Sequence, residues 1–173
     1  MIYQYAHTDG EMKRLLGWGG IDDFASHPYS HAVDGKLFTY WAFDSSKADV
    51  SKRQGEAFIG LSSWTEAEQD RLYLWASNLK CKQFQVTVEK KVGVWKELDA
   101  HCHATTPKFS DIDKAFFTFK WKPEVFRAIK VNIQNENADR QGGDFKVYEI
   151  SFRDHTGLCS TFTAANHDIC GVL

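Results

Sequence analysis

The strongest constraint on the fold is a strict alternation of apolar and polar residues in the second half of the chain. In one such segment, Ile129, Val131 and Ile133 alternate with Lys130 and Asn132. Successive side chains of a β-strand point to opposite faces, so this period predicts half-buried strands with one face on a core. The pattern recurs in Lys82–Glu89, Phe116–Trp121, Arg127–Gln134 and Phe145–Phe152.

The strands are short, and turn residues separate several of them. Lys90–Gly93 predicts a hairpin between the strands 84–89 and 94–98. Thr65–Asp70 is a weak helix candidate, with Thr65 as its cap and Glu68 three residues later. Many short strands without a βαβ rhythm predict an all-β sandwich or barrel.

Length and charge narrow the function classes. The chain has 173 residues, which fits one domain, and a net charge of −2, which gives no electrostatic basis for binding nucleic acid. No apolar run approaches the roughly 20 residues that span a bilayer, so we expect no transmembrane segment. The sequence leaves the localisation open.

The four cysteines are too few for a disulfide scaffold. Cys81 and Cys102 flank the predicted hairpin, where a cross-strand bridge and free buried thiols are both compatible with the sequence. Cys159 and Cys170 could form a disulfide in an oxidising compartment. The His101-Cys102-His103 triplet invites a metal interpretation, as does a second set, but neither spacing matches a compact zinc site. That second set comprises His155, Cys159, His167 and Cys170.

The order of several motifs resembles discoidin domains, also called coagulation factor V/VIII C-type domains, and related carbohydrate-binding modules attached to glycosidases. Asp34-Gly35 is followed by Thr39 and Trp41, four and six residues after the glycine, as in that family. The other matching stretches are Glu56–Leu61, Phe84–Glu89 with Val94–Leu98, and Phe126–Gln134 with Phe145–Phe152.

The resemblance covers roughly Ile21–Phe152, about the length of one domain. It implies an antiparallel β-sandwich (jelly roll) of the galactose-binding-domain-like type over residues 1–152, with residues 153–173 as a tail or an extension packed on it. The link between Leu72 and Phe84 departs from the family. Sugar-binding relatives often carry a histidine after the motif tryptophan, whereas this chain has Ala42, which puts galactose specificity in doubt.

The resemblance also implies one structural Ca²⁺. Many relatives bind it through the Asp-Gly loop, the threonine and a glutamate of the last strand, which correspond to Asp34, Thr39 and Glu149 here. Backbone carbonyls near Lys36 would add oxygen ligands, since Ca²⁺ takes 6–8 of them. The alternative is that Glu149 lies hydrated at the rim or pairs with a lysine or arginine.

In such sandwiches the ligand is expected on loops at one end. A sugar site needs an exposed aromatic ring for stacking and polar groups that bind hydroxyls. Trp41, Trp95 and Trp121 lie in strand patterns and are expected in the core. The candidates for ligand binding are Trp18, His27, Tyr29, Phe43, Asp44, Trp64, Trp75, Asn78 and Lys80.

The resulting hypothesis is a non-catalytic, lectin-like carbohydrate-binding module that binds a glycan or glycoprotein. The alternative is a protein-interaction or adhesion domain on the same scaffold. A lipid-headgroup binder is disfavoured by the net charge and by the lack of an obvious apolar loop. An enzyme is disfavoured because the sequence contains no nucleotide-binding loop, no Gly-x-Ser-x-Gly and no His-Glu-x-x-His motif.

Overall fold

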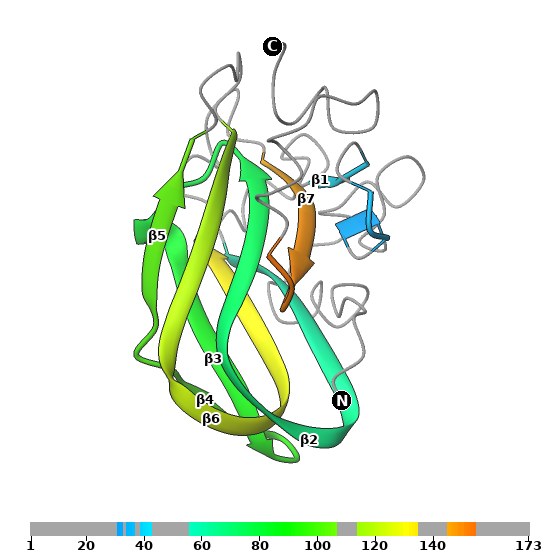
Figure 1. The fold of residues 1–173 in the computed structure, drawn as a ribbon, viewed down its shortest axis with the longest axis vertical. Coiled ribbons are helices and arrows are strands. Elements are labelled where there is room, and N and C mark those ends of the chain that lie inside the picture. Colours follow the sequence, from blue (N-terminus) through cyan, green and yellow to red (C-terminus); the bar gives the residue numbers. More distant parts are fainter. Residues whose placement is uncertain are drawn as a thin grey trace, which may run out of the picture.

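The computed structural model describes residues 31–32, 34–36, 39–42, 56–106, 114–134 and 145–154. Within these residues the chain is an antiparallel β structure without an α-helix (Figure 1). Its elements are β1 (Trp41–Ala42), β2 (Glu56–Ser77), the 3₁₀ turn η4 (Cys81–Gln83), β3 (Phe84–Lys91), β4 (Val94–Glu97), β5 (His101–Thr105), β6 (Lys114–Gln134) and β7 (Lys146–Ser151).

Two long, curved strands, β2 and β6, belong to both layers of a sandwich. Residues 56–62 of β2 pair with residues 128–134 of β6, which also pairs with β3, and β3 with β4. Residues 67–77 of β2 pair with residues 114–126 of β6 and with β7, while β5 pairs with β6 and β1 with β7. Figure 1 shows β2 and β6 bending together at the lower end. The fold is therefore the predicted all-β sandwich, and the hairpin between β3 and β4 is confirmed.

The bends explain two wrong predictions. Thr65–Asp70 is not helical, because it lies within β2 where the register with β6 shifts between Ser62 and Ala67. The predicted strands 116–121 and 127–134 are one strand, β6. Pro123 between them lies where the pairing skips from Lys120 to Glu124, and a bulge tolerates a residue without an N–H.

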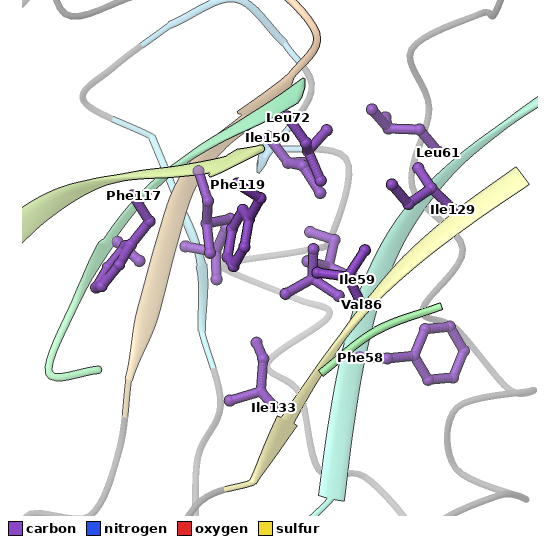
Figure 2. Packing of buried hydrophobic residues seen from close by; sticks show 14 of the residues in the cluster. Phe58, Ile59, Leu61, Leu72, Val86, Phe117, Phe119, Ile129, Ile133 and Ile150 are labelled. Carbon is purple, nitrogen blue, oxygen red and sulfur yellow. The ribbon is translucent and has the colours of Figure 1, made fainter. Parts of the chain in front are cut away.

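The core lies between the inner faces of the two layers. Figure 2 shows Ile59 directed into this space, whereas Phe58, its neighbour on β2, points to the opposite side. The buried side chains come from both layers and include Ile59, Leu61, Val86, Ile129, Val131, Leu72, Leu74, Phe117, Phe119 and Ile150. Alternation thus predicted the core-facing residues of β3 and β6 correctly.

The strand tryptophans divide into two groups. Trp41 and Trp121 are buried, as predicted. Trp95 is half-buried, and its register partner is Glu89, on the face of β3 away from the core. The ammonium of Lys130 lies 3.9 Å from the centroid of the Trp95 ring, so the expectation of a core position is wrong for this residue.

Gly60 lies where β6 leaves no room for a side chain on β2. A Cβ atom added there would lie 2.5 Å from the carbonyl oxygen of Ile129, which is a backbone atom. We expect Gly60→Ala to lower the free energy of unfolding by about 1–3 kcal/mol, the usual cost of overpacking. Urea denaturation measures the loss, with Gly93→Ala as a comparison in which strain comes from the positive φ of 79° and no atom lies near the added Cβ. Unchanged stability of Gly60→Ala would contradict this close approach.

A disulfide joins η4 to β5. Cys81 and Cys102 are linked with a Cα–Cα distance of 5.7 Å, across 21 positions of sequence. Of the two states left open by the sequence, the bridge is therefore the one formed.

No helix in the described part of the chain is long and apolar enough to span a membrane.

Candidate metal and ligand site

The Asp-Gly motif forms the predicted turn. Gly35 has a φ of 76°, a left-handed conformation that favours glycine. The Asp34 carboxylate accepts a hydrogen bond from the backbone N–H of Lys36 at 2.9 Å and another from the hydroxyl of Thr39. These contacts within the turn hold the carboxylate in one orientation.

A bulge in β7 directs Glu149. In the pairing of β2 with β7, Trp75 lies opposite Glu149 and Ala76 lies opposite Val147, so Tyr148 is an extra residue in β7. Bulges commonly redirect a side chain. Strict alternation along 145–152 would place Glu149 on the same face as Val147, but the extra residue changes the phase and places it on the face of Trp75.

The structure brings the two acids, Asp34 and Glu149, together. Glu149 is 3% exposed, and its Oε2 atom has no hydrogen-bond partner among the described residues. Burial, and after it the negative charge of Asp34, raise the pKa of Glu149 to about 8, although a hydrogen bond from the backbone N–H of Gly35 acts in the opposite direction. Two carboxylates facing each other, one with a buried oxygen left over, form a site suited to a cation.

The donor set fits a hard cation. Carboxylate oxygens from Asp34 and Glu149, with hydroxyl and carbonyl oxygens of the turn, are the ligands that Ca²⁺ prefers. The backbone N–H of Lys36 donates to the Asp34 carboxylate. That backbone carbonyl oxygens near Lys36 are ligands of the ion stays a prediction. Sequence reasoning missed the Gly35 N–H as a partner of Glu149, although the Asp-Gly motif itself was a signal for a turn with inward N–H groups.

Trp75 does not provide an exposed ring. It is 2% exposed and stacks on Phe116 with ring centroids 3.3 Å apart. Tyr148 and Tyr40 complete this second aromatic cluster. The prediction that Trp75 binds ligand is wrong for this arrangement, because its ring face is covered.

The structure describes some of the other predicted ligand residues and not the rest. Asn78 follows β2 with a φ of 62°, and exposed Lys80 precedes η4, where its N–H donates to the side chain of Gln83 at 2.8 Å. Trp64 lies in β2. The predicted loop residues Trp18, His27, Tyr29, Phe43 and Asp44 lie outside the described residues.

The metal interpretation of His101-Cys102-His103 fails, because Cys102 belongs to the disulfide. Within the described ranges, no three histidine, cysteine or acidic side chains converge on one point. The second set, His155 to Cys170, lies beyond those ranges, as does nearly all of the expected tail 153–173.

Solved carbohydrate-binding modules share this fold. A pectin-binding carbohydrate-binding module superposes with a TM-score of 0.53 at 14% identity, over 90% of this chain and 93% of its own. Chitosan-binding module 2 of a chitosanase/glucanase from Paenibacillus sp. IK-5, in complex with chitotriose, gives a TM-score of 0.54 at 15% identity, over 86% and 94%. CBM32-1 from a family 31 glycoside hydrolase of Clostridium perfringens gives 0.53 at 14%, over 86% and 94%.

No family model matches the sequence, and no curated protein matches it. The structural likeness nevertheless extends over most of each chain. The chain therefore has the discoidin-like, galactose-binding-like sandwich fold of the carbohydrate-binding modules.

Proposed function

We propose that the chain is a non-catalytic carbohydrate-binding module that binds glycans through loops at one end of the sandwich. The observation that carries the proposal is the fold shared with solved modules whose structures are described as pectin-binding or bound to chitotriose. Fold alone does not fix function. The proposal therefore depends on the loop side chains, above all Trp18, being available to a sugar.

Calcium is the proposed structural ion of this module. The support is geometric: Asp34 and Glu149 converge, and a buried carboxylate oxygen lacks a partner in the described residues. A bound cation would neutralise the two acids and fix the Asp34 turn against β7. Its role is to hold the scaffold, and the glycan contacts belong to the loops.

Binding of a coherent class of glycans on an array, with Ca²⁺ present, tests the proposal. We expect Trp18→Ala to weaken this binding by roughly tenfold or more, because a stacked aromatic ring is a typical hot spot. Val92→Ala is the matched control, since Val92 lies exposed on the β3–β4 turn. An array without signal for the wild type, or binding unchanged by Trp18→Ala, would contradict the loop site.

One observation favours the second candidate, a protein-interaction or adhesion domain. Val92 and Val94 are 77% and 60% exposed on the β3–β4 hairpin, so a partner protein could bury both apolar side chains. A silent glycan array, together with capture of one protein that Val92→Ala prevents, would favour this function over glycan binding.

A further inference from the structure

The outer face of the layer formed by β5, β6, β2 and β7 carries a row of basic residues. His101 on β5 lies directly opposite Lys120 on β6, and Lys120 lies directly opposite Arg71 on β2. Their neighbours in sequence point inward, since Leu72 and Phe119 are in the core. His101, Lys120 and Arg71 are exposed, so the row faces solvent. We call it the basic row.

A second row beside it carries hydrogen-bonding groups. His103, Thr118 and Tyr73 lie opposite one another across β5, β6 and β2, while Ser151, opposite Tyr73 on β7, is buried. Arg71 hydrogen-bonds the side chain of Tyr73, which joins the two rows. Three adjacent strands span roughly 10 Å, so exposed His103 and half-buried Thr118 and Tyr73 lie beside the basic row within reach of one ligand.

The basic row is not explained by folding. Like charges directly opposite on neighbouring strands are destabilising, and Arg71 with Lys120 is such a pair. Asp70 pairs with Arg71 at 3.1 Å, but both side chains are nearly half exposed, and exposed pairs are worth little. An anionic ligand would relieve the repulsion by accepting hydrogen bonds from Lys120 and from the guanidinium N–H groups of Arg71 that do not donate to Asp70 or Tyr73.

We propose that this sheet face binds an acidic polysaccharide, separately from the loop site. The proposal rests on the proposed carbohydrate-binding function and adds a second surface with a stated ligand chemistry. Hydroxyl and imidazole groups beside the cations suit a sugar polymer. The net charge of −2 over the whole chain disfavours a nucleic acid, which needs a broader basic surface.

Affinity electrophoresis of the full chain tests the proposal with three probes. Alginate carries carboxylates, dextran sulfate carries sulfates, and dextran carries neither. We expect retardation by alginate, dextran sulfate or both, weakening as salt increases, and none by dextran. Which acidic polymer retards the protein identifies the anionic group.

The variant Arg71→Ala/Lys120→Ala is expected to lose roughly tenfold in affinity for the acidic polymer. Lys91→Ala/Lys96→Ala is the control, because it removes the same charge from the β3–β4 hairpin, away from the basic row. Thermal unfolding checks that each variant is folded, and Arg71→Gln repeats the test with a single change. Equal losses in both double variants would mean a non-specific charge effect and would overturn the proposal.

Absence of retardation by either acidic polymer would also overturn it, as would a duplex DNA probe that binds as tightly through the same two residues. The loop site is tested independently. Loss of binding to neutral glycans in Trp18→Ala with unchanged retardation by the acidic polymer separates the two surfaces. A silent array with intact, Arg71-dependent retardation would contradict the loop site alone.

Discussion

Adding Ca²⁺ to the metal-free protein is expected to raise its melting temperature by roughly 5–10 °C, and Glu149→Gln is expected to abolish the rise. An ion at a hundred times its dissociation constant stabilises the folded state by about 2.7 kcal/mol, and each 1 kcal/mol shifts the melting temperature by roughly 2–4 °C at this chain length. Glu149 supplies the buried carboxylate oxygen that lacks a partner among the described residues. The neutral amide of the glutamine in the variant cannot replace this carboxylate as an anionic ligand. Differential scanning calorimetry with and without a chelator measures both effects.

The metal-free protein provides a control with the opposite sign. Because burial and Asp34 raise the pKa of Glu149 from 4.5 to about 8, the folded state keeps a proton that the unfolded state releases. The resulting stability is complete below the unfolded value and is lost as pH rises through the folded one. Without Ca²⁺, the free energy of unfolding of Glu149→Gln should therefore rise relative to that of the wild type as the pH increases from about 5 to 8. A Ca²⁺-dependent rise that survives in the variant would contradict the assigned ligand.

Removing the disulfide is expected to lower the free energy of unfolding by about 3 kcal/mol in Cys81→Ala/Cys102→Ala. The bridge closes a loop across 21 positions of sequence, and this loop contains the whole β3–β4 hairpin. Opening it gives the unfolded chain more conformations and releases η4 from β5. Urea denaturation of wild type and variant under non-reducing conditions measures the difference.

Adding a reductant distinguishes the contribution of this bridge to stability from that of the other cysteine pair. The wild type should lose stability on reduction, and the double variant should not respond if Cys81–Cys102 is the bridge that matters. A double variant that still responds would support the predicted Cys159–Cys170 disulfide. A loss smaller than about 1 kcal/mol in the variant would contradict a stabilising role for the Cys81–Cys102 bridge.

Local sequence patterns predicted most of the fold, because they depend on neighbouring residues alone. Period-two alternation identified β3, β7 and the core-facing residues of β6, and Asp34-Gly35 identified a turn. The bends of β2 and β6 were not predictable in this way. The cap-like Thr65 and Glu68 resemble a helix start, and only pairing with β6 keeps these residues in a strand.

The candidate site was predictable only through the family resemblance. Nothing local relates Asp34 to Glu149, which are brought together by the turn and by the bulge at Tyr148. The polar residues Ser77 and Asn78 follow Trp75 closely, so the sequence favoured a loop at a position that lies within β2. The basic row could not be predicted from the sequence either. His101, Lys120 and Arg71 become neighbours only through the register of three strands.

The continuity of β2 and β6 through both layers has a mechanical consequence. Neither layer can separate or slide without carrying the same two strands with it, so the sandwich should melt as one cooperative unit. β7 is hydrogen-bonded to β2, and β2 extends into the opposite layer. The strand that pairs with β7 at Glu149 is therefore the same strand that continues into the far layer.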